Sequence, residues 1–526
     1  MYQKYKFNWE RSVLKPARVW NAFLFRRLIM ELGNISIEKL LELVSGYDIE
    51  SVSLIEKAYN YAYSIHGEQR RKSGELYIMH PLFVAYFLAS IGADCDTICA
   101  ALLHDVIEDG ENITKEDITH EFNDTVAILT DGVTKMKLEL FDSKEAQNNA
   151  NTRKIIMGMK TDVRIIIIKL VDRLHNMLTL DFLPRNKQIQ NSLETLEIFV
   201  PLANRLGLQQ LKNMLEELAF KHLNNDIYNL IDEKKNRYIL DKKESLEQTK
   251  NEFENILNYN GIDNNISYRF KRNYSIYRGI ISDKNPRLLL ELGIDDICDK
   301  IDISSDNIHD LQSLKVIVNN IEECYSSLEL LQHNYEIIPG KVKDCIYTPK
   351  TNGYQSIHTT ILDNNNEQLQ TQIRTNEMDI KDSWGIADNW RTNFDKNSYC
   401  MQNELYNKFP FFKKMLEIDK YMKDDASFVE QVKIEILSEM IYPFNREGKV
   451  VELPLGSTII DFASYELENL NNKIIALVNG RIVSPNYMLK SKDNVDLVLI
   501  SNKQLANISY NVITTRAKQR IRSLHR

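Results

Sequence analysis

The sequence lacks any stretch that could cross a membrane. A membrane-spanning helix needs about 20 consecutive apolar residues. The longest aliphatic block covers only residues 165–168, and Arg164 and Lys169 flank it directly. We therefore expect no membrane partner, and we interpret this block as a buried helical turn or strand.

Cysteine is scarce and scattered. The chain has six cysteines and no Cys-x-x-Cys pair; they are Cys95, Cys99, Cys298, Cys324, Cys345 and Cys400. This spacing disfavours both a structural zinc site and a framework of disulfides. We expect reduced thiols and a cytoplasmic location.

A strong charge of either sign is also missing. The formal net charge is -8 over 526 residues, which argues against a protein that coats nucleic acid with its whole surface but leaves room for local basic patches. With 43% apolar and 27% charged residues, the composition is that of an ordinary globular protein. The length predicts three or four domains.

The first 29 residues contain a single acidic residue, Glu10, among many basic and aromatic ones. This composition weakly resembles a targeting peptide. A surface amphipathic helix is one alternative, and an upstream start with Met30 as the true initiator is another. The sequence leaves all three open.

Periodicity divides the rest of the chain. Residues 35–235 follow a helical pattern, 311–375 are rich in β-strand formers, 376–435 return to a charged helical pattern, and 440–500 form a small β-rich module. Within this module we expect a strand at residues 450–453, a helix that begins after Gly456-Ser-Thr458, and a hairpin at Asn479-Gly480. The final stretch is basic, with Arg516, Lys518, Arg520, Arg522 and Arg526. The pattern predicts a multidomain α+β protein.

Residues 102–109 read Leu-Leu-His-Asp-Val-Ile-Glu-Asp. On one helix, His104 and Glu108 would lie four residues apart, as would Asp105 and Asp109, so all four polar groups would share one side. Acidic and imidazole groups against an apolar background cost desolvation energy unless a cation compensates them. We therefore expect a metal site here.

Two further segments supply polar groups. In residues 169–180, Asp172, Asn176 and Thr179 fall on one helical stripe. His80 precedes Pro81, which favours a helix start, and we expect His80 to face outward from the core there. Any one histidine alone is more simply a structural residue. Together, two imidazoles and two carboxylates suit a divalent Mn, Fe or Zn ion with open positions for water, and hence a phosphohydrolase.

A second cluster follows further along the chain. Residues 269–278 place cations beside aromatics, which suits nucleotide phosphates and base stacking, although a solvated helix end explains the pattern equally well. Residues 341–358 add more lysines and a turn that displays Tyr354. Strand alternation places Gln370, Gln372 and Arg374 on one face.

These motifs together resemble those of the long RelA/SpoT homologues, enzymes that make and destroy the alarmone (p)ppGpp. The resemblance is carried by residues 71–81, 104–109 and 172–176 and covers about residues 45–515. The His-Asp pair alone marks only the wider HD phosphohydrolase superfamily. The resemblance implies an all-helical HD hydrolase domain, a mixed α/β nucleotidyltransferase-like synthetase domain and a β-grasp TGS domain, without the ACT and zinc-finger domains of long members.

The implied boundaries follow from this resemblance. They are an N-terminal extension at 1–44, the hydrolase domain at 45–225, the synthetase domain at 226–400, a helical linker at 401–438, the TGS domain at 439–501 and the basic start of a linker helix at 502–526.

For the hydrolase domain the resemblance also implies residue roles. Four residues are implied as Mn²⁺ ligands, namely His80, His104, Asp105 and Asp172. Glu108 and Asp109 are implied to orient and activate the attacking water. The implied substrate contacts are Arg71 and Lys72 for the base, with Asn176 and Thr179.

For the synthetase domain the resemblance implies transfer of pyrophosphate from ATP to GDP or GTP. The implied nucleotide-binding residues are Arg269, Lys271, Lys343, Lys350, Tyr354 and His358, with Tyr354 stacking on the acceptor guanine. Asp310 is implied as a Mg²⁺ ligand. The basic segment 341–344 is similar to that of bifunctional members.

The synthetase motifs depart from the family pattern. Gln370 stands where the family has glutamate, Gly279 where it has lysine and Lys315 where it has arginine, and the stretch 279–310 is longer than usual. We therefore expect a Mn²⁺-dependent (p)ppGpp 3′-pyrophosphohydrolase with a weak or inactive Mg²⁺-dependent synthetase.

Three other interpretations stay open. The first is a fully bifunctional enzyme, the second a non-catalytic sensor of guanine nucleotides and RNA, and the third an HD hydrolase of another nucleotide. Contact of the TGS domain with tRNA on the ribosome is a further expectation, and the oligomeric state is left undetermined.

Overall fold

The computed structural model describes residues 35–136, 138–281, 285–304, 308, 310–350, 352–392, 398–467, 473–500 and 511–524. The chain forms two compact units. One comprises residues 1–135 and 155–408, and the other 136–154 and 409–526. The three interpretations of the first 29 residues lie outside the described residues.

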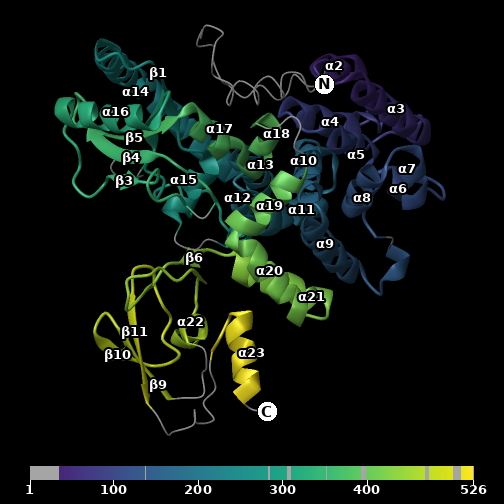
Figure 1. Cartoon of the computed structure of the whole chain (residues 1–526). Coiled ribbons are helices and arrows are strands. Elements are labelled where there is room, and N and C mark those ends of the chain that lie inside the picture. The colour runs from purple at the N-terminus through teal and green to yellow at the C-terminus, as the bar shows by residue number, and fades with distance from the viewer. Residues whose placement is uncertain are drawn as a thin grey trace. The chain divides into compact units, whose positions relative to one another are not determined.

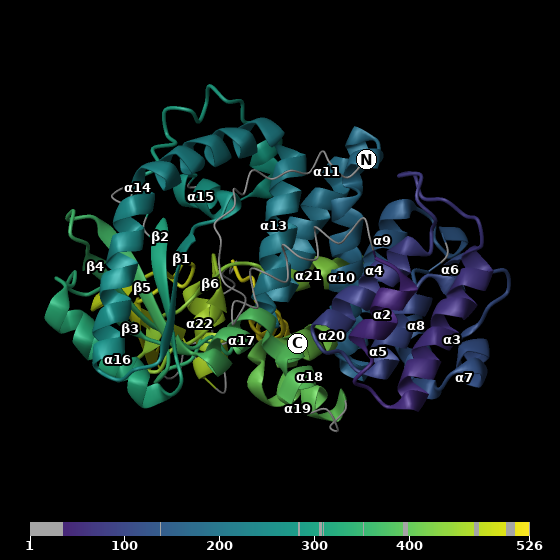
Figure 2. The same ribbon diagram turned by 90° about the horizontal axis from the view of Figure 1, so that it is seen from above.

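The first half of the larger unit is helical, as predicted (Figures 1 and 2). The helices are α2 (Ile37–Leu43), α3 (Ile49–His66), α4 (Met79–Ser90), α5 (Cys95–Leu103), α6 (Val106–Asp109), α7 (Lys115–Glu121), α8 (Asp124–Val133), α9 (Lys144–Thr161, divided between the units), α10 (Arg164–Leu178), α11 (Arg185–Glu194), α12 (Val200–Arg205) and α13 (Gln209–Leu223). Helices α4 and α10 are buried along most of their length, and residues 165–168 form a buried turn of α10. The core thus surrounds the two helices that carry His80 and Asp172.

A long helix, α14 (Asn225–Tyr259), leads into a mixed five-stranded sheet. The strand order is β1-β2-β5-β4-β3, with β2 and β5 parallel and the other pairs antiparallel. The strands are β1 (Asn264–Phe270), β2 (Gln312–Val318), β3 (Lys343–Asp344), β4 (Ile357–Leu362) and β5 (Gln368–Thr375). One apolar face packs on α14 and α16 (Ile321–Asn334), visible in Figure 2. The opposite face of the sheet does not belong to this apolar core, so it can carry polar side chains.

The stretch between β1 and β2 is anchored to α14 where it is described. It contains α15 (Asn273–Ile280) and the short 3-10 helix η5 (Pro286–Leu290). The Asn224 amide donates to the carbonyl oxygens of Leu289 and Leu292, each at 2.9 Å. Lys234 donates to the carbonyls of Cys298 and Ile301. The lengthened segment is thus hydrogen-bonded to the start and first half of α14.

After β5 the chain returns to the helical half. The elements are α17 (Asn376–Trp384), η6 (Gly385–Asp388), α18 (Asn389–Thr392) and α19 (Ser398–Lys408). Gly385 has φ +50° and lies directly against Gly207, where an added Cβ would come within 2.5 Å of the Gly207 carbonyl carbon. The Trp390 indole donates to Asp94 at 2.9 Å. The helical and mixed-sheet halves are thereby joined by close backbone packing.

The second unit contains a helical segment and a small β-rich module. The helices are α20 (Pro410–Tyr421), α21 (Asp425–Val432), α22 (Ile459–Glu466) and α23 (Thr515–Leu524). The strands are β6 (Met440–Ile441), β7 (Phe444–Asn445), β8 (Leu453–Pro454), β9 (Lys473–Val478), β10 (Arg481–Val483) and β11 (Asn494–Ile500). The hairpin at Asn479-Gly480 is confirmed, since it joins the antiparallel strands β9 and β10. The helix after Thr458 is confirmed as α22, with Thr458 and Asp461 in a capping box.

The predicted strand at residues 450–453 is wrong in its extent. Val450 makes only an isolated bridge to Phe444, and the strand β8 begins at Leu453. The Val451 amide donates to the Pro443 carbonyl at 2.9 Å. Proline has no amide hydrogen, so Pro443 cannot donate a bond in return and the ladder stops.

The predicted fold class is confirmed, with a helical domain, a mixed α/β domain and a small β-rich module. None of the helices in the described ranges is both long and apolar enough to span a bilayer.

Candidate active site

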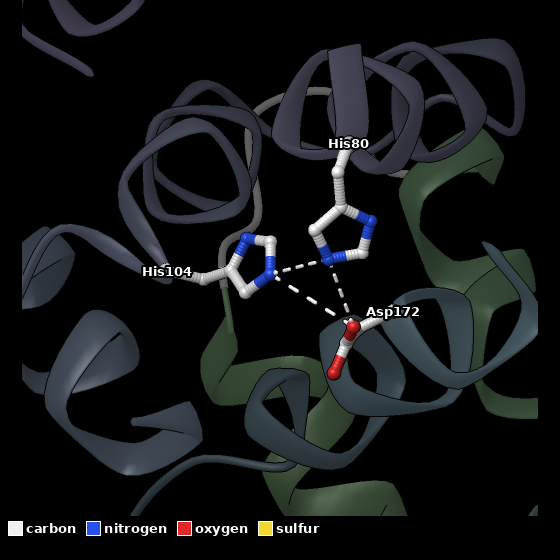
Figure 3. A group of neighbouring side chains, drawn as sticks. All are labelled: His80, His104 and Asp172. Carbon is white, nitrogen blue, oxygen red and sulfur yellow. Dashed lines mark hydrogen bonds and ion pairs between the residues drawn. The ribbon is translucent and has the colours of Figure 1, made fainter. Parts of the chain in front are cut away.

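Three elements bring a cluster of imidazole and carboxylate groups together in the helical half (Figure 3). His80 comes from the first turn of α4, His104 from the end of α5 and Asp172 from the middle of α10. The two Nε2 atoms lie 3.2 Å apart. Asp172 Oδ1 lies 3.1 Å from His80 Nε2 and 3.9 Å from His104 Nε2. All three side chains are buried, so the cluster is shielded from bulk water.

Asp105 completes the predicted set of four. Its Oδ1 lies 3.4 Å from His104 Nε2, and its Oδ2 lies 3.7 Å from His80 Nε2. The Tyr77 hydroxyl donates to Asp105 Oδ2 at 3.0 Å and so fixes that oxygen. The four residues singled out from the sequence are thus neighbours in space.

Two expectations about local structure need correction. Residues 102–109 are not one helix, because α5 ends at Leu103 and α6 begins at Val106. The break lets the adjacent side chains of His104 and Asp105 both reach the cluster. His80 does begin a helix, but it is buried at 2% exposure instead of facing outward, because α4 is surrounded by other helices.

The hydrogen bonds decide which ring nitrogens carry protons. His104 Nδ1 lies 2.8 Å from the Ala101 carbonyl oxygen, which can only accept, so Nδ1 carries the hydrogen. His80 Nδ1 lies 2.9 Å from His175 Nδ1, which already accepts from Arg71 at 2.8 Å, so His80 Nδ1 is also a donor. In the neutral rings both Nε2 atoms therefore present lone pairs.

This arrangement fits a metal ion. Two imidazole lone pairs and the Asp172 oxygen converge without a proton between them, which is unfavourable unless a cation lies among them. Burial lowers the pKa of His80 to about 4, although the neighbouring Asp172 carboxylate acts against this, so the ring is neutral at physiological pH. Two imidazoles with two carboxylates suit a divalent transition-metal ion.

Charge around the carboxylates keeps them ionised. Burial alone would raise the pKa of Asp105, but the imidazoles of His104 and His80 outweigh it and lower the pKa to about 2. For Asp172, burial is likewise outweighed, chiefly by Lys169, whose Nζ lies 2.6 Å from Oδ2, and its pKa falls well below the usual range. Lys169 forms an ion pair with Asp172 Oδ2, and Asp172 Oδ1 faces the two histidines.

Glu108 and Asp109 lie on α6 beside the cluster, and both are exposed. Glu108 Oε1 lies 3.6 Å from Lys135 Nζ, and Asp109 Oδ2 lies 3.9 Å from the buried His66. Burial and then the negative charge of Asp105 raise the pKa of Asp109. These two carboxylates thus follow Asp105 along the chain, and they contact Lys135 and His66.

The predicted substrate contacts converge in part. Arg71 Nη2 donates to Asn176 Oδ1 at 2.6 Å, and Nη1 lies 3.5 Å from Thr179 Oγ1. Asn176 Nδ2 donates to Asp172 Oδ1 at 2.6 Å, which links this group to the metal cluster. Lys72 is exposed, and the contacts described here do not include it. Asp172, Asn176 and Thr179 share one side of the α10 region, as the helical stripe predicted.

Sequence reasoning missed Tyr77, Lys169 and His175. Lys169 could have been found from the sequence, because it is a single charge within the apolar run of α10. The structure shows that it is indeed buried, with 5% exposure. His175 lies three residues after Asp172, within the motif that carried the resemblance. Tyr77 likewise lies within residues 71–81, which carried the resemblance, but its contact with Asp105 depends on the loop before α4.

A second group of polar residues gathers on the open face of the five-stranded sheet. The register pairs Arg269 with Ser313, Ser313 with Gln370, Gln372 with His358 and His358 with Lys343 across neighbouring strands, so they share this face. Gln370, Gln372 and Arg374 do lie on one face, as strand alternation predicted.

Tyr354 is partly covered instead of displayed. Its hydroxyl lies 2.6 Å from His358 Nε2, Lys350 Nζ lies 4.6 Å from its ring centre, and Arg374 lies over the ring at 5.3 Å. Burial, and then the positive charges of Lys350 and Arg374, lower the pKa of His358 to about 3. The His358 ring that contacts the tyrosine hydroxyl is therefore neutral.

Several carboxylates at this face are paired with cations. Asp310 contacts Lys271, Asp379 contacts Lys315, and Asp382 contacts Arg374. Gln370 Oε1 accepts from Gln372 Nε2 at 2.9 Å. Gly279 is exposed, with open space where a Cβ would stand. The face is thus cationic, with its carboxylates engaged.

A helical domain with a buried His, His-Asp and Asp cluster, joined to a mixed-sheet domain with a cationic face, defines a protein that combines an HD-type domain with a nucleotidyltransferase-like domain. Family models agree. Residues 58–209 match an HD domain, residues 268–397 match the region found in RelA / SpoT proteins, and residues 441–499 match a TGS domain.

Known relatives align over nearly the whole chain. A guanosine-3′,5′-bis(diphosphate) 3′-pyrophosphohydrolase of Aquifex aeolicus is 35% identical and covers 94% of this chain and 67% of its own length. A GTP pyrophosphokinase of Myxococcus xanthus is 37% identical over 90% of this chain. A crystal structure of the small alarmone synthetase 2 from Bacillus subtilis is 25% identical and covers 36% of this chain and 98% of its own, with a TM-score of 0.23.

The chain belongs to the RelA/SpoT family. It spans about 60% of the length of the Myxococcus xanthus relative.

Proposed function

We propose that this protein is a Mn²⁺-dependent pyrophosphohydrolase that removes the 3′-pyrophosphate of (p)ppGpp. One observation carries the proposal, namely that two unprotonated imidazole nitrogens and an ionised carboxylate converge in a buried cluster. Burying these groups costs desolvation energy, and a protein that only binds nucleotides would have no need of them. The pyrophosphohydrolase relative from Aquifex aeolicus supports the choice of substrate.

His80, His104, Asp105 and Asp172 would hold the ion. When bound, the ion supplies a water of lowered pKa and neutralises phosphate charge. Glu108 and Asp109, both exposed at the rim, would orient the attacking water and handle its proton. The raised pKa of Asp109 makes this carboxylate a better proton acceptor than an ordinary aspartate.

Arg71 would contact the guanine, with Lys72, Asn176 and Thr179 beside it. Arg71 is already held by Asn176, so little side-chain freedom is lost when the base binds. The same Asn176 bonds to Asp172, which ties the base site to the metal site.

We further propose that the synthetase-like domain is weak or inactive. Its expected Mg²⁺ ligand Asp310 contacts Lys271, and the position of a second acidic residue is the neutral Gln370. Mg²⁺ is usually captured by one or two carboxylates together with phosphate. The exposed cations Arg269, Lys343 and Lys350 would still bind phosphate.

A fully bifunctional enzyme is the second candidate. It is favoured by the GTP pyrophosphokinase of Myxococcus xanthus, which aligns across the same domains. We also keep as proposals a cytoplasmic location, GDP, GTP and ATP as ligands, and contact of the TGS domain with tRNA on the ribosome.

One assay separates the candidates. Purified protein is given labelled ppGpp with Mn²⁺, and separately ATP and GDP with Mg²⁺. We expect pyrophosphate release in the first reaction and little or no ppGpp in the second. Comparable rates in both would establish the bifunctional enzyme, and no turnover with retained nucleotide binding would establish the sensor.

A further inference from the structure

His175 occupies a position between the metal cluster and the base site. It lies on α10 and is 5% exposed. Its Nδ1 lies 2.8 Å from Arg71 Nη1 and 2.9 Å from His80 Nδ1. A single nitrogen therefore contacts both an expected base-binding residue and an expected metal ligand.

The chemistry of the three groups fixes the direction of both bonds. A guanidinium group can only donate, so His175 Nδ1 presents its lone pair. His80 Nδ1 must then donate to the same lone pair, which leaves His80 Nε2 free to bind a metal.

Two donors that share one lone pair compete for it. When Arg71 bonds strongly to His175, the bond from His80 is weakened, and the reverse also holds. A stronger acceptor at Nδ1–H makes the other nitrogen of a metal-bound histidine more basic. Any change in how Arg71 bonds must therefore change how well His80 binds an ion.

We propose that His175 is a positioning residue that sets the His80 tautomer and couples the occupancy of the base site to the affinity of the metal site. The proposal rests on the proposed function for the identity of the two sites. Coupling of this kind is reciprocal, so a nucleotide that draws Arg71 away from His175 tightens the metal, and the metal in turn tightens the nucleotide.

The test compares two substitutions of His175. His175→Asn keeps an acceptor atom close to the Nδ1 position, whereas His175→Phe keeps a flat ring and removes the acceptor. Mn²⁺ affinity is measured by titration of the chelator-treated full chain without nucleotide. We expect the Phe variant to lose affinity by about 10- to 100-fold, the usual effect of losing such a partner. We expect the Asn variant to stay within a few-fold of the natural protein.

His222→Phe is the matched control. His222 is another largely buried histidine of the same half, whose Nε2 lies 3.3 Å from the Met177 carbonyl oxygen. Its loss should leave Mn²⁺ affinity unchanged. If His175→Phe fails to fold, His175→Gln, which moves the acceptor away from the Nδ1 position, takes its place.

Coupling needs a second measurement. Arg71→Gln should raise Mn²⁺ affinity by a larger factor in the natural background than with Phe at position 175. Equal factors in both backgrounds, or unchanged Mn²⁺ affinity in His175→Phe, would overturn the inference. Because metal titration needs no turnover, a protein that binds Mn²⁺ but does not hydrolyse ppGpp refutes the proposed function while still deciding the role of His175.

Discussion

Lys271 and Asp310 form an ion pair at the open face of the mixed sheet, with Nζ 2.5 Å from Oδ1. Asp310 adopts φ +57°, a left-handed conformation that aspartate tolerates better than most residues. The resemblance implies that Lys271 binds phosphate and that Asp310 binds Mg²⁺. In the conformation seen here each neutralises the other, so a metal that binds Asp310 competes with the lysine.

The first prediction follows from this pair. Gln370→Glu should raise Mg²⁺-dependent synthesis of ppGpp from ATP and GDP, because a second carboxylate would help Asp310 to hold the ion. The gain should be partial, and larger when Gly279→Lys restores a cation. Asn366→Asp adds the same charge on an exposed loop and should change nothing. Strong synthesis by the natural protein, at rates that match its hydrolysis, would contradict the prediction.

The second prediction concerns the metal. Asp105→Ala should lower bound Mn²⁺ and abolish pyrophosphate release from ppGpp, because it removes one of two carboxylates from the cluster. Asp96→Ala is the control, since Asp96 lies at the start of α5, away from the cluster at its end, and accepts from the Asn123 amide. Metal content and turnover are measured together. A full complement of metal with unchanged turnover in Asp105→Ala would exclude Asp105 as a ligand.

The third prediction separates chemistry from metal binding. Glu108→Gln should keep Mn²⁺ but reduce turnover by about 100-fold or more, the usual scale for lost acid–base or water-positioning help. Its ion pair with Lys135 is partly exposed, so stability should change little. Loss of Mn²⁺ with unchanged chemistry per bound ion would instead make Glu108 a ligand.

The fourth prediction is a pH dependence of stability. The pKa of His358 is about 3 in the folded chain, against about 6.5 when unfolded, so between these values the unfolded chain binds more protons. The contribution of His358 to the free energy of unfolding is complete above pH 6.5 and is lost as the pH falls towards 3. At pH 5 this loss is on the order of 2 kcal/mol.

Denaturant unfolding at pH 7 and pH 5 checks this prediction. His358→Gln keeps a neutral polar group, so the natural protein should lose more stability between the two pH values than the variant. Equal losses would show that His358 is not held neutral by its surroundings.

Much of the fold and of the metal cluster could be predicted from the sequence because the information is local. The stripe of Asp172, Asn176 and Thr179 follows directly from the period of a helix. The break between α5 and α6 could not be predicted this way, since the sequence from Leu102 to Asp109 reads as one helix. The break lies at His104 and Asp105, whose contacts are with other parts of the chain.

The burial of His80 and the role of His175 depended on contacts across the chain. Ninety-five positions separate these residues, and their contact exists only once α4 packs on α10. Helical periodicity places each on its own helix but does not say which helices are neighbours. The coverage of Tyr354 by Lys350 and Arg374 escaped prediction for the same reason.

The close approach of Gly207 and Gly385 has a consequence for how this chain can change. A side chain at Gly385 would meet the Leu206 carbonyl oxygen and the Gly207 backbone, so any substitution there forces the two halves apart. Phe87 of α4, the helix of His80, also packs edge-on against Trp384, with ring centres 6.1 Å apart. The mixed-sheet half therefore covers part of α4 in the helical half. Substitutions at the synthetase-like site could therefore accumulate one by one in evolution without disturbing this packing. Deletion of the whole domain would instead expose α4, the helix that carries the expected metal ligand His80.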